Sequence, residues 1–130
     1  SDGTNVVRLT NNSHTDTEPS WSPDGTKIVF TSDRDSICCP VNDEIYVMDA
    51  VDSDGDGNGD NLVRITNNTT TANQDGSPNW SPDGSMITWV HRTNGYPVGG
   101  YDVWAMNADG SGQTNLTNDF GTVAEPDLSP

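Results

Sequence analysis

The densest group of chemically capable side chains is a run of aspartates between residues 52 and 60. Asp52, Asp54, Asp56 and Asp60 occupy positions 1, 3, 5 and 9 of this run, and Asn58 occupies position 7. Calcium binds about six to eight oxygen ligands with flexible geometry, and alternate residues of a tightly turning loop supply them. We therefore expect the four carboxylates and the backbone carbonyl of Asn58 to bind Ca²⁺, with water completing the coordination.

This run differs from an EF-hand. Position 12, where an EF-hand carries a bidentate Glu, is Val63, and neither flank has the periodicity of a helix. Mg²⁺ suits so many protein ligands less well, because it keeps several of its waters. The alternative is a solvated acidic turn, in which carboxylates this close would repel one another without a counter-ion. The expected role of the ion is structural: it stiffens a long hairpin and cancels local charge.

No other pattern in the chain indicates catalysis. His14 and His91 lack the spacing of paired metal ligands, and we expect both to be solvent-exposed loop residues. The Gly-Ser-Gly at residues 110–112 lacks the surroundings of a nucleophile elbow. No phosphate-binding or dinucleotide-binding glycine motif occurs. We therefore expect a protein that is not an enzyme.

Charge and hydropathy exclude two classes of partner. The formal net charge is −15, and the 5 basic residues are scattered, so the chain cannot neutralise a nucleic-acid backbone or an anionic membrane surface. No apolar run is long enough to span a bilayer, so no membrane insertion is expected. Residue 1 is Ser rather than Met, which indicates a processed product or a segment of something longer.

Two further features concern the compartment of the protein. Cys38 and Cys39 are adjacent, which is not a metal-binding spacing. They could form a strained vicinal disulfide, bond to another chain or remain thiols, and we favour a disulfide because the other features indicate an extracytoplasmic protein. Candidate N-glycosylation sites, which could carry glycans, are Asn11, Asn67, Asn68 and Asn115.

An internal repeat indicates how the chain is organised. Residues 18–30 (EPSWSPDGTKIVF) return as residues 77–89 (SPNWSPDGSMITW) and begin again at residues 125–130 (EPDLSP). Each copy predicts two strands joined by Ser-Pro-Asp-Gly, in which Pro presets φ, Asp caps the turn and Gly takes the left-handed corner. The repeat therefore predicts hairpins at equivalent places in successive units.

Two further blocks complete the repeating unit. The segment EIYVMDA from residue 44 matches YDVWAMNA from residue 101, and VRLTNN from residue 7 matches VRITNN from residue 63 and TNLTN from residue 114. Alternating apolar residues predict one strand per block, so the unit is four short antiparallel strands. Such a unit, in about 40–45 residues before insertions, has the size of a propeller blade.

At this point the sequence resembles the TolB-like β-propeller repeat. The resemblance rests on WSPDGTKIVFTSDRD from Trp21 and YDVWAMNADGSG from Tyr101, and it covers most of the chain outside the insertions near Cys38 and Asp52. The acidic loop resembles the calcium hairpins between strands of integrin α-subunit blades. A β-sandwich with a coincidental duplication is the alternative, which a repeat this long disfavours. The resemblance implies an all-β fold and a scaffold for protein interaction.

The order of the blocks predicts an incomplete propeller of about two and a half blades. Residues 1–16 would hold the closing strand of a preceding blade (at 5–10), residues 17–75 a blade with the calcium-loop insertion, residues 76–124 a second blade, and residues 125–130 the opening strand of a following blade. Propellers usually need about four to eight blades to close, and open edges are prone to aggregate. We therefore expect further blades of a longer chain, or other copies of this chain, as partners.

The function expected from the sequence is a non-catalytic, calcium-stabilised extracellular or cell-surface propeller module for protein interaction or self-assembly, which could be a fibre subunit. The periplasm is the alternative location. The alternative functions are an accessory propeller of a larger secreted hydrolase or lyase, and a carbohydrate-binding propeller.

Overall fold

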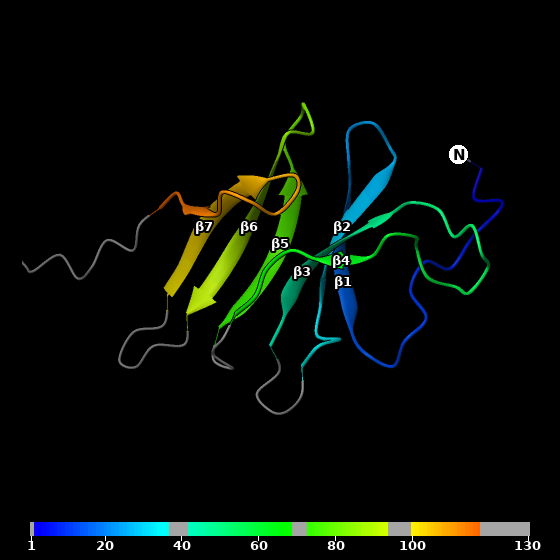
Figure 1. The fold of residues 1–130 in the computed structure, drawn as a ribbon, viewed down its shortest axis with the longest axis horizontal. Helices are drawn as coiled ribbons and strands as arrows, with labels where there is room; N and C mark the ends of the chain where they lie inside the picture. The colour runs from blue at the N-terminus through cyan, green and yellow to red at the C-terminus, as the bar shows by residue number, and fades with distance from the viewer. Residues whose placement is uncertain (1, 37–41, 69–72, 94–99, 118–130) are drawn as a thin grey trace, which may run out of the picture.

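The structure is a computed structural model, and it describes residues 2–36, 42–68, 73–93 and 100–117. Within these ranges the chain forms two four-stranded antiparallel sheets and no helix (Figure 1). Consequently, no helix that could cross a membrane is found in the described part of the chain. The all-β prediction and the prediction of four-stranded blades are both confirmed.

The first sheet has the strand order β1-β2-β3-β4. Its strands are β1 (Asp16–Trp21), β2 (Lys27–Ser32), β3 (Glu44–Asp49) and β4 (Val63–Arg64). The centre of the sheet is an unbroken register of β2 against β3, in which Val29 faces Val47. Both faces of β2 and β3 are buried, as the apolar sequences KIVF and IYVM favour.

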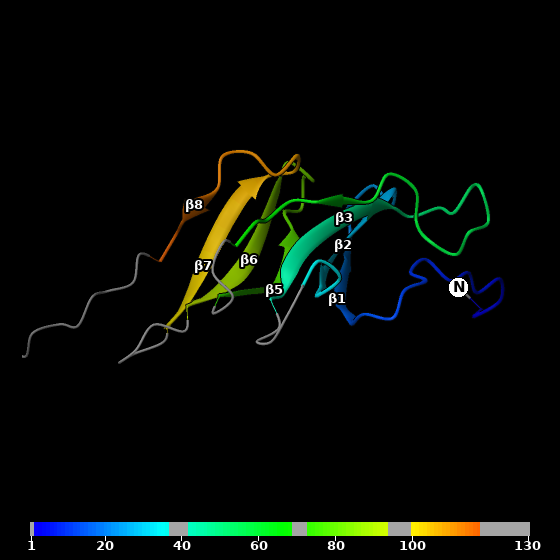
Figure 2. The same cartoon turned by 60° about the horizontal axis from the view of Figure 1, so that its bottom comes forward.

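The second sheet repeats this arrangement with the order β5-β6-β7-β8. Its strands are β5 (Gln74–Trp80), β6 (Met86–Thr93), β7 (Gly100–Asn107) and β8 (Thr114–Asn115). Each sheet is therefore one blade, and Figure 2 shows the two lying side by side with β5 beside the first sheet.

The first strand of each blade carries a bulge at the same place in the repeat. The pairing of β1 with β2 shifts between Thr17 and Ser20, and the pairing of β5 with β6 shifts between Gly76 and Asn79. Glu18 and Ser77, the residues before the repeated prolines, have φ values of 54° and 53°. The repeat thus specifies a local backbone distortion as well as the strands.

The main hydrophobic core lies between the blades. Val29, Ile45 and Val47 of the first blade form one buried cluster with Ile87, Trp89 and Met106 of the second. Ile65, which follows β4, packs against the edge of this cluster. Burial of apolar surface contributes a free energy of about 25 cal/mol per Å². These contacts therefore hold the two blades together as one unit.

A second core covers the opposite face of the first blade. It contains Ile28, Phe30, Tyr46 and Met48, and Leu9 from the N-terminal segment packs against it. Leu9 is the counterpart of Ile65 in the repeat, so it contacts the first blade as Ile65 contacts the second.

One sequence expectation differs from the structure. Residues 5–10, expected as the closing strand of a preceding blade, contain no strand. The reason is physical, since a strand needs a hydrogen-bonded neighbour and no strand of a preceding blade is among the described residues. The segment nevertheless keeps a conformation seen in the repeat: Arg8 Nε donates to the Thr10 carbonyl at 2.6 Å, as Arg64 Nε donates to the Thr66 carbonyl at 2.8 Å. The expected opening strand at 125–130 lies outside the described residues.

Candidate metal centre

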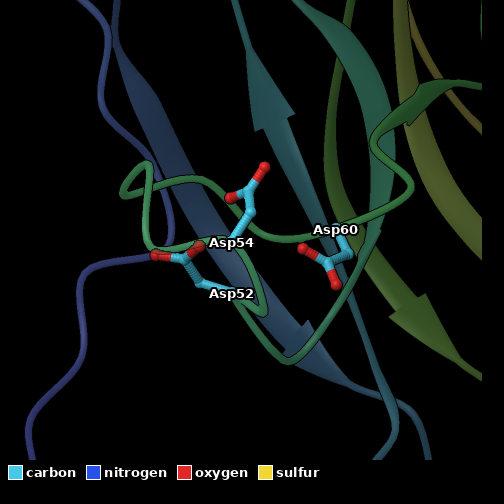
Figure 3. Close-up of side chains that lie close together, drawn as sticks. All are labelled: Asp52, Asp54 and Asp60. Carbon is cyan, nitrogen blue, oxygen red and sulfur yellow. The ribbon is translucent and has the colours of Figure 1, made fainter.

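The loop between β3 and β4 brings three carboxylates together (Figure 3). Asp52, Asp54 and Asp60 each offer one carboxylate oxygen, and these atoms all lie within 4.8 Å of one another. Asp52 and Asp60 are half-buried, whereas Asp54 is exposed. Hard carboxylate oxygens at this spacing are the ligand type that a divalent cation such as Ca²⁺ prefers.

Amides of the loop hold Asp52 and Asp60 in place. Asp52 accepts hydrogen bonds from the backbone N–H groups of Gly55, at 2.8 Å, and Gly57, at 2.9 Å. Asp60 accepts from the backbone N–H of Ser53 at 3.2 Å and from its hydroxyl. Two carboxylates at opposite ends of the loop are thereby tied to its backbone before any ion is added.

The side chains of the other two residues in the expected ligand set, Asp56 and Asn58, make other hydrogen bonds. Asp56 lies in the same loop, but its carboxylate is not in the group of three and accepts a hydrogen bond from the Asn58 amide at 2.7 Å. The side-chain oxygen of Asn58 accepts from the backbone N–H of Asn11 at 2.8 Å. The structure therefore brings Asp52, Asp54 and Asp60 together and leaves Asp56 outside their cluster.

The loop also contacts the N-terminal segment, which the sequence analysis did not foresee. The Gly59 amide donates to the Leu9 carbonyl at 2.8 Å, and the Asn11 side-chain amide donates to the Asp56 carbonyl at 3.2 Å. Figures 1 and 2 both show the loop (green) beside the N-terminal segment (blue). Leu9 belongs to the block that the repeat assigns to a preceding blade, and the acidic loop ties the first blade to this N-terminal segment.

The second blade makes an equivalent contact at the matching place in the repeat. In the second blade, the turn between β7 and β8 approaches Ile65 in the same way: a Cβ built on Gly110 would lie 3.1 Å from the Ile65 Cβ. In both blades, the loop after the third strand therefore touches the repeat block that precedes the blade in the sequence, at Leu9 or at Ile65. The acidic insertion is an enlarged form of this general blade contact.

A buried hydrogen-bond network around Asp75 in the second blade was also missed. Asp75, which is 2% exposed, accepts hydrogen bonds from Trp89 Nε1 at 3.0 Å and binds His91 Nδ1 at 2.6 Å. The expectation that His91 is a solvent-exposed loop residue is wrong, because it lies in β6 with its side chain 13% exposed. The network links β5 to β6, and the alternation of apolar residues gives no sign of it.

The candidate glycosylation sites lie in different surroundings. Asn67 is exposed and its oxygen accepts from Arg64 at 2.9 Å, whereas the nitrogen of Asn68 is buried and has no hydrogen-bond partner among the described residues. The side-chain nitrogens of Asn11 and Asn115 donate to the Asp56 carbonyl and the Asp102 carboxylate. Cys38 and Cys39, the expected disulfide, lie outside the described residues.

Comparisons with known proteins agree with the architecture. The profile of the TolB β-propeller domain matches residues 1–130. An uncharacterized protein of Agrobacterium fabrum is 39% identical over 90 residues, which is 68% of this chain and 29% of the relative. A solved structure of a TolB-like protein from Agrobacterium tumefaciens superposes with a TM-score of 0.62 at 26% identity, and the match covers 83% of this chain and 35% of that one.

The chain thus spans about a third of the length of the relatives that it matches. The repeat, the two blades and the match along the whole sequence lead to one conclusion: the chain belongs to the TolB β-propeller domain family.

Proposed function

We propose that the chain is a non-catalytic propeller module that calcium stabilises and that binds other proteins or further copies of itself outside the cytoplasm. The observation that carries the proposal is the convergence of Asp52, Asp54 and Asp60 in a loop that also contacts the N-terminal segment at Leu9. An ion at this place would act on the contact between the first blade and this segment, which is a structural role.

The electrostatics favour an ion in the loop. Three carboxylate oxygens within 4.8 Å of one another repel when no cation lies between them. The chain has a net charge of −15, so it gains from any bound cation. Ca²⁺ accepts irregular sets of carboxylate, carbonyl and water ligands, whereas Mg²⁺ demands a near-ideal octahedron.

The expected location follows from the same chemistry. Modules outside the cytoplasm bind calcium with Kd values of about 10⁻⁴–10⁻³ M, because the ion is abundant there. We therefore place the module outside the cytoplasm, at the cell surface or in the periplasm. An intramolecular or intermolecular disulfide at Cys38 and Cys39 is part of this proposal.

The two outer faces of the blade pair support a partner that resembles another blade. Trp21 is 59% exposed, whereas Trp80 at the same position of the next repeat packs against the core between the blades. On the far blade, Leu116 is 57% exposed, whereas its counterpart Ile65 packs against that core. Both faces thus present apolar side chains of the kind that blade contacts bury.

Calcium titration with thermal unfolding tests the proposal. In the wild-type chain, 5 mM CaCl₂ should raise Tm by several degrees over chelator-treated protein, and MgCl₂ should raise it less. Asp54→Asn should remove most of that rise, whereas Asp109→Asn, which removes the same charge from an exposed residue in the turn between β7 and β8, should keep it. An equal Tm with CaCl₂ and with chelator would refute calcium stabilisation.

Particle mass tests the self-assembly part separately. Light scattering coupled to size exclusion should find species heavier than the 13.9 kDa chain. Trp21→Ser should reduce their abundance if the exposed blade face carries the association. A wild-type chain that remains a monomer at high concentration would restrict the partners to further blades of a longer protein.

A further inference from the structure

A groove with a volume of about 770 Å³ lies between the two blades, at the end where their Ser-Pro-Asp-Gly turns meet. Its apolar lining includes Val47, Val63, Ile65 and Trp80. Residues of both blades form its walls, so a further blade added to either outer face would leave these walls in place. The groove is separate from the acidic loop, although Asn61 touches both.

One donor in the groove lining lacks a partner. Trp80 Nε1 is buried and has no hydrogen-bond partner in the described part of the protein. By contrast, the indole nitrogen of Trp89 in the same blade does have an acceptor, since Trp89 Nε1 donates to Asp75 at 3.0 Å. A buried N–H without a partner costs about 1–3 kcal/mol. Trp80 is therefore held by packing against the core between the blades rather than by a hydrogen bond of its indole nitrogen.

The rim of the groove is anionic. Asp24, Asp83 and Asp109 line it, and the turn hydrogen bonds that each receives all go to Oδ1. Lys27 also lines the groove, but its ammonium is paired with Asp49 at 2.6 Å.

These rim carboxylates stay ionised at neutral pH. The Ser22 hydroxyl and then the Thr26 amide lower the pKa of Asp24 to about 2. The Ser81 hydroxyl and then the Ser85 amide do the same for Asp83, whose pKa is also about 2. An apolar floor inside a fixed negative rim is complementary to an apolar group that carries positive charge around it.

We propose that this groove binds a basic peptide segment of a partner protein: an apolar side chain enters between Val63 and Trp80, and flanking Lys or Arg residues contact the rim. The inference deepens the proposed function, because it rests on the module's role in protein interaction. A free apolar molecule would leave the rim unused, and an acidic peptide would be repelled by it.

The test is fluorescence anisotropy on the full 130-residue chain, with three capped, fluorescein-labelled heptapeptides. The first has a central leucine among lysines and glycines, the second has glycine in place of the leucine, and the third has glutamates in place of the lysines. The leucine–lysine peptide should bind at least about fivefold more tightly than the glycine–lysine peptide, and the glutamate peptide should not bind. Equal binding of the two lysine peptides would mean attraction to net charge alone and would overturn the proposal.

Three variants test whether the leucine–lysine peptide binds in the groove. Trp80→Phe keeps a ring but reduces the apolar surface of the groove wall, and it should weaken the leucine–lysine peptide about threefold or more. Val63→Gln alters a side chain that is 55% exposed, so it should weaken binding without unfolding the chain. Trp21→Phe, the same change at the same repeat position outside the groove, should leave Kd unchanged. Loss of binding in Trp21→Phe, or retention in both groove variants, would contradict the assignment.

The outcome is separable from that of the calcium proposal. A chain that CaCl₂ stabilises but that binds the leucine–lysine and glycine–lysine peptides equally would refute the groove alone. A chain that binds the leucine–lysine peptide through Val63 and Trp80 but has no calcium-dependent Tm would refute calcium stabilisation alone.

Discussion

The carboxylate of Glu18 accepts hydrogen bonds from Ser77, both from its backbone N–H and, at 3.1 Å, from its hydroxyl. The two residues occupy the same position of the repeat in neighbouring blades, and each has a positive φ at the bulge of its first strand. The bulge takes the Ser77 amide out of the regular ladder, and the preceding blade supplies the acceptor. A glutamate stands again at residue 125 in the third copy.

This bridge predicts the effect of replacing Glu18. Glu18→Ala removes both bonds to Ser77 and the 3.1 Å bond from the Thr31 hydroxyl, so it should lower the free energy of unfolding by about 1–2 kcal/mol. Urea denaturation measures the change. Glu18→Gln keeps an acceptor oxygen and should lose less than half as much. Equal losses in the two variants would show that Glu18 does not act through these hydrogen bonds.

Gly59 gives a second prediction, because the acidic loop passes close to β3 there. A Cβ at this position would lie 2.6 Å from the Asp49 carbonyl oxygen and 2.7 Å from the Met48 sulfur. Since a backbone oxygen cannot move aside cheaply, Gly59→Ala should cost about 2–3 kcal/mol in urea denaturation.

The matched control lies in the same loop. Gly55 has a φ of 76° and open space around its Cβ position, so Gly55→Ala should cost only the backbone strain of about 1 kcal/mol. A loss in Gly59→Ala no larger than that in Gly55→Ala would contradict the close packing of the loop on β3.

The sequence was enough to predict the strands of each blade and the turns between them. Alternating apolar residues and the repeated Ser-Pro-Asp-Gly define the β1–β2 and β5–β6 hairpins locally, since both signals act over a few residues. The repeat then places Leu9 and Ile65 at equivalent positions, and both pack as the repeat suggests.

Contacts between distant residues could not be predicted. Asn11 and Asn58 are 47 residues apart, and no local pattern indicates that their hydrogen bond ties the acidic loop to the N-terminal segment. Alternation within the loop also suggested that Asp56 points inward with its neighbours, whereas its carboxylate binds the Asn58 amide. Asp52 and Asp60 also accept hydrogen bonds from the loop and still converge, so the spacing of the aspartates alone does not tell which carboxylates point inward.

The buried Asp75 gives a third prediction. Asp75→Ala leaves Trp89 Nε1 without its acceptor in a buried place and should cost about 2–3 kcal/mol. Trp89→Phe removes the donor instead, so Asp75→Ala should cost clearly less when it is made in the Trp89→Phe chain. A double-mutant cycle by urea denaturation measures the difference. Additive losses would mean that the hydrogen bond between these two side chains contributes nothing.

The Ser-Pro-Asp-Gly turns predict a dependence on acid. The folded chain holds the pKa of Asp83 at about 2, against 3.8 for the free side chain, chiefly through the Ser81 hydroxyl. A lowered folded pKa contributes stability that is present above the unfolded value and is lost as pH falls from 3.8 towards 2. In Asp83→Asn, Tm should therefore fall less steeply over that window than in the wild type. If Tm falls equally steeply with pH in Asp83→Asn and in the wild type, the Asp83 carboxylate does not contribute to acid unfolding.

Asp43 should behave in the opposite way. Burial raises its pKa, and the nearby charges of Asp33 and Glu18 raise it further. A raised folded pKa means that the stability present below the unfolded value of 3.8 is lost as pH rises through the folded one, so at neutral pH the ionised Asp43 destabilises the fold. Asp43→Asn should therefore raise Tm at pH 7 and have little effect at pH 3, as thermal unfolding at the two values would measure. A lower Tm at pH 7 would mean that the Asp43 carboxylate makes a stabilising contact that outweighs the repulsion from Asp33 and Glu18.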